Sequence, residues 1–172
     1  MGIDLKNWMQ NLPDGSDLLA LNLCGTHDCV TQHIRLPHFF CCQDLTVYEQ
    51  LLLGVRALDI RVRADGKCLT MVHGIFPAYN HSCHRANLMD MGDVLSQCYR
   101  FLDECPGEAV VFQFKNDNGK ENEQCFDNLF YTYIKGKEPY WYLEDRVPTL
   151  GAARGKPKRS ASFNSISGSI ST

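Results

Sequence analysis

The sequence lacks several features by which common classes of protein are recognised. None of the apolar stretches in its 172 residues approaches the roughly 20 residues that a membrane-spanning helix needs. Residues 1–13 lack the apolar core of a signal peptide. We therefore predict no transmembrane segment and favour a cytoplasmic location, with secretion left open.

Clustered positive charge is also scarce. The chain carries 17 Lys and Arg against 20 Asp and Glu, a formal net charge of -3, and its only dense basic run lies at residues 154–159. Contact with a nucleic-acid backbone needs a concentrated positive surface. No nucleic-acid partner is predicted.

Cysteine is abundant, but it lacks the pattern of a disulfide framework or a metal site. The nine cysteines are an odd number without a repeating spacing, and in the absence of an export signal they are interpreted as reduced thiols, several of them facing the core. A structural zinc site at His81, Cys83 and His84 would need a second pair of ligands at suitable spacing, which the sequence does not offer. No metal is predicted there, and Cys41 and Cys42 are interpreted as packing residues.

Length and composition favour one globular domain followed by a tail. A hydrophobic content of 44% over 172 residues is enough for one core and too little for two separate ones. Residues 156–172 are basic and then rich in Ser, Gly and Asn, with no apolar period. We predict a folded domain at residues 1–155 and a disordered tail at 156–172.

Helical and strand patterns alternate along the domain. The residue after the predicted helix 46–54 starts a strand, and Asp65-Gly66 predicts a hairpin turn. This alternation is typical of a parallel α/β fold. The predicted helices are 5–12, 46–54 (with Thr46 and Glu49 as a capping box), 93–105 (with Asp93 as N-cap) and 121–135, and the predicted strands are 18–24, 55–63, 68–72 and 109–114.

Charged and apolar residues alternate strictly in the strand 55–63. Leu58, Ile60 and Val62 share one face, and Asp59, Arg61 and Arg63 share the other. In a small closed barrel both faces of a strand are covered, so the charged face would line a pocket or bind an anion. The alternative, an edge strand with a solvated charged face, is left open by this pattern alone.

Polar side chains cluster where the predicted strands end. In a parallel barrel those ends converge on one face, where such enzymes carry their chemistry. One imidazole can accept a proton from a nucleophile, a second can donate one to a leaving group, and a guanidinium can neutralise a phosphoryl oxygen, so the substrate would be a phosphodiester. The side chains concerned are His27, Asp28, Asp59, Arg61, His73, and Lys115 with Asp117.

Several motifs resemble the X-domain of bacterial-type phosphatidylinositol-specific phospholipase C. The resemblance covers about residues 5–156 with the motifs in family order, although Cys24 and Cys29 stand where Pro and Ser are common. The motifs are residues 23–28, 49–50, 54–62, 73–74, 101–102, 148–151 and 153–156, together with Pro106 and Glu108.

This resemblance implies an α/β fold of the TIM-barrel type, distorted and represented here by its N-terminal half. The family continues past Lys156 with further strand and helix units, which are expected to hold the carboxylate that pairs with His27. The half barrel is expected to be marginally stable alone, because its last strand has an open edge.

The implied reaction is cleavage of phosphatidylinositol to diacylglycerol and inositol 1,2-cyclic phosphate at a membrane surface, by a monomer. The resemblance gives Arg61 the work that calcium does in the eukaryotic relatives, so no metal and no cofactor are expected. The implied roles are general base for His27, general acid for His73, orientation of His73 for Asp28, binding of the phosphoryl oxygens for Arg61 beside Asp59, and contact with the inositol headgroup for Lys115.

Two other interpretations remain open on the sequence alone. A glycerophosphodiesterase-like barrel would act on soluble diesters, but it usually holds a metal with extra Glu residues at the strand ends, which are not seen. A non-catalytic fragment would bind inositol phospholipid or a partner protein without turnover.

Overall fold

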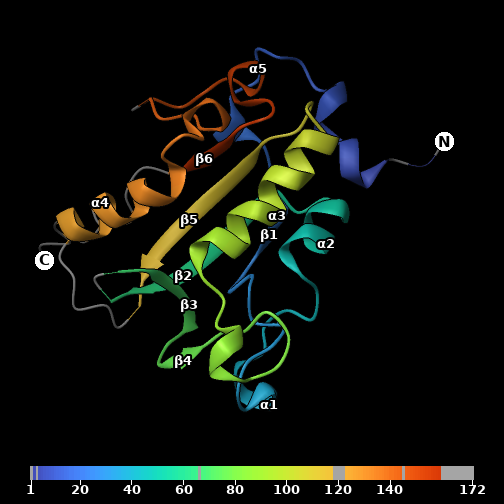
Figure 1. Ribbon diagram of the computed structural model, residues 1–172. Helices are drawn as coiled ribbons and strands as arrows, with labels where there is room; N and C mark the ends of the chain where they lie inside the picture. Colours follow the sequence, from blue (N-terminus) through green and yellow to red (C-terminus); the bar gives the residue numbers. More distant parts are fainter. Residues whose placement is uncertain (1, 3, 66, 118–122, 145, 160–172) are drawn as a thin grey trace, which may run out of the picture.

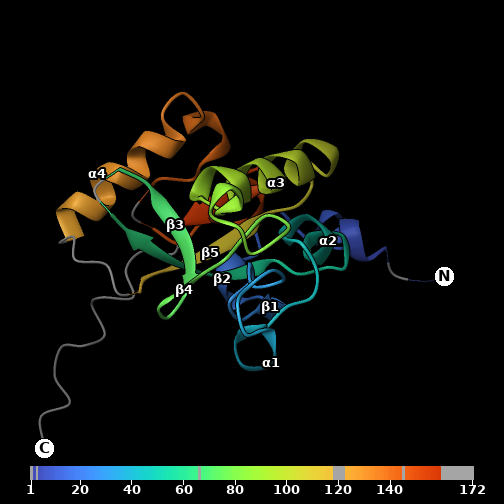
Figure 2. The ribbon, with the colours of Figure 1, turned by 60° about the horizontal axis from the view of Figure 1, so that its bottom comes forward.

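One sheet, with the two longest helices on one side of it, forms the centre of the fold (Figures 1 and 2). The computed structural model describes residues 2, 4–65, 67–117, 123–144 and 146–159. The strands are β1 (Gly25–Thr26), β2 (Ala57–Ala64), β3 (Leu69–His73), β4 (Phe76–Pro77), β5 (Val110–Asn116) and β6 (Pro157–Arg159). The α-helices are α1 (Pro37–Phe40), α2 (Val47–Leu52), α3 (Met91–Glu104), α4 (Glu123–Ile134) and α5 (Leu150–Ala153).

Strand β2 is the centre of the sheet. The strand order is β4-β3-β2-β5-β6, and β2 pairs in parallel with β5 from Ala57 to Val62. Its other edge carries two partners at different heights: β1 is parallel to its first residues, and β3 is antiparallel to its last ones. Because β2 has partners on both edges, the alternative of a solvated edge strand is wrong.

The alternation of charged and apolar residues in β2 is confirmed. Leu58, Ile60 and Val62 are fully buried in the main core, together with residues of α2 and α3. Figure 2 shows α3 and α4 on the same side of the sheet. The charged face of β2, which consists of Asp59, Arg61 and Arg63, therefore points to the side of the sheet that these helices leave uncovered.

The helix before β2 has the predicted ends. The Thr46 side chain accepts a hydrogen bond from the Glu49 backbone N–H, and the Glu49 carboxylate accepts one from the Thr46 N–H. The φ angle of Gly54 is +97°, a value that favours glycine, and the backbone of Leu5 lies close to it. Helix α3, in contrast, begins after Asp90 rather than Asp93. Asp93 is the third helical residue and forms a capping box with Asp90, and this extra first turn buries Met91.

The predicted strand at 18–24 is wrong. Leu18–Ala20 form a 3-10 helix capped by the Asp17 side chain, and only Gly25–Thr26 pair with β2. A second, smaller core under the sheet contains Met9, Leu18, Ala109, Val111, Leu150 and Ala153. Leu18 belongs to this core, and Leu21 and Leu23 pack against it. They are apolar because they cover this end of the sheet, and pattern alone does not distinguish that from a buried strand.

The N-terminal segment forms two 3-10 helices, Leu5–Asn7 and Met9–Asn11, rather than one helix over 5–12. Trp8 between them anchors this segment, since its Nε1 donates to the Gly54 carbonyl at 3.0 Å. Beneath it the buried Glu108 carboxylate accepts from the Met9 and Gln10 N–H groups and pairs with Arg56. These contacts connect the N-terminal segment to the chain just before the first residues of β2 and β5.

The end of the described chain departs from the prediction of a disordered tail. Pro157–Arg159 form β6, which is parallel to β5 and pairs Val110 with Pro157. Residues 160–172 of the predicted tail lie outside the described residues, as do residues 118–122 ahead of α4 and Gly66 of the predicted hairpin turn. None of the helices within the described ranges is long and apolar enough to cross a bilayer.

Candidate active site

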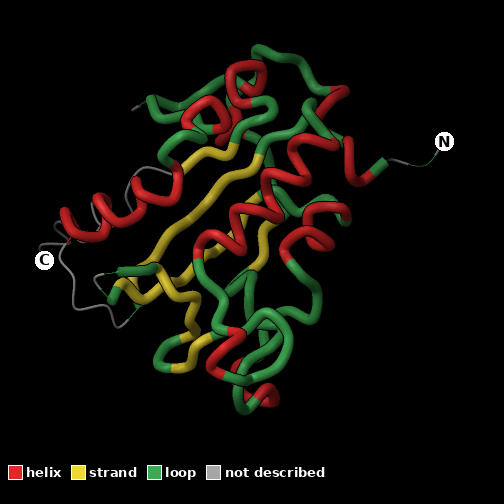
Figure 3. The backbone as a smooth tube through the Cα atoms, viewed as in Figure 1, coloured by secondary structure: helices red, strands yellow, loops and turns green. Residues whose placement is uncertain are grey.

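The predicted site residues meet at the middle of β2, not at a row of parallel strand ends. Thr26, the last residue of β1, pairs with Leu58, so His27 and Asp28 follow directly beside Asp59. Strand β3 runs back along β2 from the pair Ala64 and Leu69, so that its last residue, His73, returns toward the same level. Much of the chain at this end of the sheet is loop (Figure 3). The expected convergence therefore occurs, but an antiparallel hairpin brings His73 into place.

A strained turn buries the carboxylate of Asp28. Its φ angle is +47°, a left-handed conformation that Asp adopts more easily than most residues but still at some cost. The turn is held because the Asp28 N–H donates to the Asp59 carboxylate and the Cys29 N–H donates to the Asp59 carbonyl. As a result the Asp28 side chain is fully buried.

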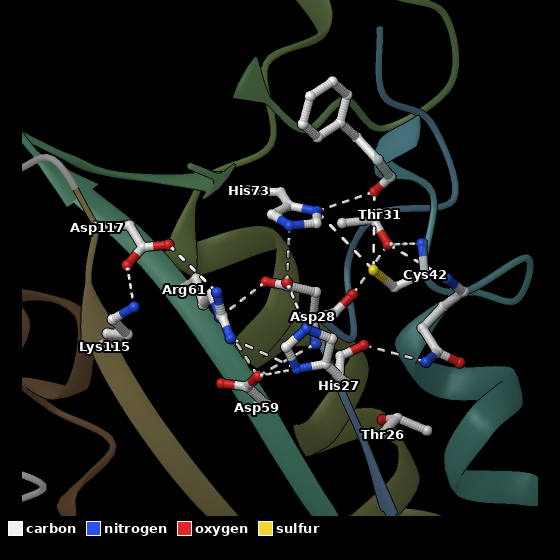
Figure 4. A network of polar contacts seen from close by, with 12 residues as sticks. Thr26, His27, Asp28, Thr31, Cys42, Asp59, Arg61, His73, Lys115 and Asp117 are labelled. Carbon is white, nitrogen blue, oxygen red and sulfur yellow. Dashed lines mark hydrogen bonds and ion pairs between the residues drawn. The ribbon is translucent and has the colours of Figure 1, made fainter. Parts of the chain in front are cut away.

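Asp28 contacts three of the other predicted site residues (Figure 4). Its Oδ2 lies 3.2 Å from His27 Nε2 and 3.4 Å from His73 Nε2, and its Oδ1 lies 3.2 Å from Arg61 Nε. Burial raises the pKa of Asp28, while the charges of His73, Arg61 and His27 oppose that shift. A buried carboxyl between two imidazoles can hold or release a proton as they change charge.

Arg61 lies among three carboxylates. Besides Asp28, its guanidinium lies 3.4 Å from Asp59 and 3.6 Å from Asp117. Partial burial lowers the pKa of Arg61, but the three carboxylates together raise it by more, so this side chain stays charged. Asp117 also pairs with Lys115 Nζ at 2.9 Å.

Each histidine is oriented through its Nδ1 atom. His73 Nδ1 lies 3.0 Å from the carbonyl oxygen of Phe40, and a carbonyl only accepts, so this nitrogen carries a proton. His27 Nδ1 lies 2.8 Å from Asp59 Oδ2. A carboxylate partner for His27 was expected outside this half of the barrel, and within the described residues Asp59 contacts His27 Nδ1. The two rings are nearly perpendicular, with centroids 6.3 Å apart.

A pocket of about 650 Å³ opens beside His27 on the uncovered side of the sheet. The exposed Lys115 and Gln113 of β5 form one wall, opposite Arg61 and Asp59 in the strand register. Gln113 was not predicted as a site residue, although it lies two positions before Lys115 and so on the same face of its strand. The lining residues are Gly25, Thr26, His27, Ala57, Leu58, Asp59, Arg61, Val111, Gln113, Phe114 and Lys115.

The segment 29–43, which contains α1, brings a further residue that the sequence did not assign to the site. Cys42 is exposed, and its Sγ lies 3.8 Å from His73 Nδ1, so the prediction that it is a packing residue is wrong. The Thr31 hydroxyl holds the loop in place by accepting from the Cys42 N–H at 2.8 Å. All eight cysteines that the structure describes are unpaired, and Cys29, Cys98 and Cys105 are buried.

Comparisons with known proteins give the site a context. The chain is 27% identical over 165 residues to the 1-phosphatidylinositol phosphodiesterase of Listeria monocytogenes, covering 90% of this chain and 48% of that protein. It is 28% identical over 160 residues to the protein of the same name from Staphylococcus aureus, covering 88% and 49%. A solved phosphatidylinositol-specific phospholipase C from S. aureus superposes with a TM-score of 0.77 at 27% identity, covering 91% of this chain and 52% of that one. No family model matches.

These similarities confirm two predictions from the sequence. The resemblance to bacterial phosphatidylinositol-specific phospholipase C is confirmed, and so is the fold class, a β/α barrel that is present here as an open sheet. The chain spans about half the length of the curated relatives that it matches.

Proposed function

Because the chain is a homologue of bacterial phosphatidylinositol-specific phospholipases C, we propose that it carries the reactive centre of a phosphoric diester hydrolase or lyase that acts on phosphatidylinositol. One observation supports this proposal most: two histidines meet at one buried carboxylate beside an arginine. That arrangement provides a base, an acid and a cation within reach of one phosphodiester.

His27 is the proposed general base. With Nδ1–H donating to Asp59, its Nε2 is the nitrogen that accepts a proton from the inositol 2-hydroxyl. The oxygen of that hydroxyl then forms a bond to phosphorus and closes the cyclic phosphate. In the structure Nε2 lies 3.2 Å from Asp28, a contact that requires a proton on one of the two groups, and the substrate hydroxyl would replace it.

His73 is the proposed general acid. The Phe40 carbonyl holds the proton on Nδ1, so Nε2 is the atom that gives its proton to the diacylglycerol oxygen as the bond from that oxygen to phosphorus breaks. His73 Nε2 lies 3.4 Å from Asp28 Oδ2, so this carboxylate can accept a hydrogen bond from the proton that Nε2 carries before the reaction. Asp28 would thus orient His73, as the resemblance implies.

Arg61 and Lys115 are the proposed contacts to the anionic substrate. The Arg61 guanidinium is held in place by Asp28, Asp59 and Asp117, so it can meet a phosphoryl oxygen without rearranging. Lys115 is exposed on the pocket wall next to Arg61 in the strand register, where an inositol ring bound through its phosphate would reach it.

The direct test is to incubate the chain with phosphatidylinositol vesicles and to measure inositol 1,2-cyclic phosphate. We expect product, and we expect the same rate in the presence of a chelator, because the cation at the phosphate is Arg61. A chelator that abolishes turnover would contradict the role of Arg61. A chain that binds the vesicles without forming product would support the second candidate function below.

Exposed apolar side chains surround the site and fit a membrane surface. Phe39 of α1 is 79% exposed, Ile75 before β4 is 68% exposed and Leu36 is 55% exposed. Their elements lie side by side, since the rings of Phe40 and Phe76 are 4.4 Å apart, and Phe40 also contacts His73. We infer that this rim meets the lipid surface while the headgroup enters the pocket.

Replacing Phe39 by serine is expected to weaken vesicle binding by about 10- to 100-fold, because burying one Phe side chain contributes about 1.5–3 kcal/mol. Binding is measured by sedimentation with phosphatidylinositol vesicles. Leu53→Ser is the matched control, since Leu53 is 58% exposed beside Gly54, at the end of the sheet near Trp8. Equal losses in both variants would show that the rim has no special role.

Binding of the headgroup without turnover is the second candidate function. It is favoured by the one-sided pocket, in which His27 is 58% exposed and Gln113 and Lys115 face solvent. General acid-base catalysis gains strength when water is excluded, so an open site favours binding over reaction. The vesicle assay above separates the two functions.

A further inference from the structure

Three side chains of types that bind metal ions meet at the candidate site. His27, Asp28 and Cys42 each direct one ligand atom into a space where all of these atoms lie within 4.8 Å of one another. Cys42 follows Asp28 by 14 residues, near the end of the segment 29–43 that contains α1. We propose that these three residues form a binding site for Zn²⁺, and that Zn²⁺ bound there blocks the site.

The geometry is close to that of a bound zinc ion. Zinc is held at about 2.0–2.1 Å by histidine nitrogen and at about 2.3 Å by cysteine sulfur, in a tetrahedral arrangement. Ligand atoms in such a shell are therefore about 3–4 Å apart. His27 Nε2 and Asp28 Oδ2 are already 3.2 Å apart, and rotation of the exposed Cys42 side chain would close the remaining distance.

The buried Asp28 supplies an independent reason to expect a cation. It is fully buried, and among the described residues neither of its oxygens accepts a hydrogen bond, its contacts being the ion-pair distances to Arg61, His27 and His73. A buried carboxylate oxygen without a hydrogen bond is costly unless a charge compensates it. One of its oxygens lies within 4.8 Å of the ligand atoms of His27 and Cys42, and a metal ion held by the three would provide that compensation.

The ligand types select the metal. Imidazole and thiolate prefer borderline and soft ions such as Zn²⁺, whereas Ca²⁺ and Mg²⁺ need six or more oxygen ligands or waters. Three protein ligands leave a fourth tetrahedral position open for water. The local charge also permits a divalent ion. The three carboxylates around Arg61 carry one more negative charge than the two positive charges of Arg61 and Lys115 balance.

Zinc bound at this site would stop the proposed reaction, because it would occupy the catalytic nitrogen of His27. Zn²⁺ would bind Nε2 of His27, the nitrogen that accepts the proton of the inositol hydroxyl in the reaction proposed above. A metal-bound nitrogen has no lone pair for that proton. This consequence for turnover depends on the proposed function, whereas zinc binding itself does not.

The binding test uses no substrate. The reduced full chain is titrated with Zn²⁺ by calorimetry, and in parallel with Co²⁺, whose thiolate complex has a characteristic absorption. We expect one site for each metal with a thiolate band, and Cys42→Ser should weaken binding at least tenfold and remove the band. Cys41→Ser is the matched control, because the Cys41 thiol donates to Gln43 and lies outside the cluster.

A second control addresses the exposed residues His81, Cys83 and His84. Zinc binding that is unchanged in Cys42→Ser but lost in Cys83→Ser would overturn the proposal. If the chain turns over phosphatidylinositol, each variant is also assayed with Zn²⁺ against its own zinc-free rate, and inhibition should need at least tenfold more Zn²⁺ in Cys42→Ser. A chain that binds zinc at Cys42 but forms no product would contradict the proposed reaction and leave the metal site standing.

Discussion

Replacing His27 by alanine is expected to lower the rate of cyclic phosphate formation by about 10²- to 10⁴-fold, the usual contribution of a general base. The protein should remain folded, because the His27 side chain is 58% exposed. The rate is measured on phosphatidylinositol vesicles, and folding is checked by thermal unfolding. His81→Ala is the control, since His81 is exposed and lies in a different loop.

A further measurement separates the role of the base from that of the acid. Added imidazole should restore part of the activity of His27→Ala, because the vacated space opens to the pocket. His73 is only 21% exposed beneath Phe40, so His73→Ala should respond less to added imidazole. A rate that neither substitution changes would refute the assignment of the site.

Replacing Glu108 by alanine is expected to destabilise the fold by about 3–5 kcal/mol, since it leaves a buried charge without its partner. Arg56 and Glu108 are both fully buried, with Arg56 Nη2 2.7 Å from Glu108 Oε2. Glu108 also accepts the Met9 and Gln10 N–H groups, so the substitution would release the N-terminal segment from the sheet. The free energy of unfolding is measured in urea.

Two further variants test whether the loss of stability comes from the buried charge. Glu108→Gln keeps an oxygen that can accept from Met9 but removes the charge, so its loss should be smaller and it should still fold. Glu104→Ala removes an exposed partner of Arg100 and Tyr48 and should have a much smaller effect, because solvent screens that pair. A loss for Glu108→Ala no larger than that for Glu104→Ala would contradict the prediction.

Local sequence patterns predicted the structure correctly where all the residues that determine a feature lie within one short segment. Thr46 and Glu49 lie three residues apart, so their capping box was visible in the sequence, and the alternation in β2 identified both of its faces. The same kind of reasoning failed at 18–24. An apolar segment that covers the end of a sheet has the same composition as a buried strand, and only its neighbours distinguish the two.

The candidate site shows the same division. His27, Asp28, Asp59, Arg61 and His73 were chosen because polar residues followed or interrupted apolar runs, and the structure brings all five together. Cys42 and Gln113 were missed. Cys42 comes from a segment in which apolar residues follow no regular spacing, so no pattern points to it. Gln113 resembles other polar strand residues, and only the structure shows that its face of β5 lines the pocket.

The sequence by itself determined the types of group in the candidate site and the face of β2 on which they lie, because those properties depend on residues a few positions apart. Only the tertiary structure decided how the site is assembled. His73 reaches Asp28 because β3 folds back antiparallel on β2, and Asp59 contacts His27 because β1 ends beside it. These contacts join segments more than thirty residues apart, and their distances follow from strand pairing that no local pattern records.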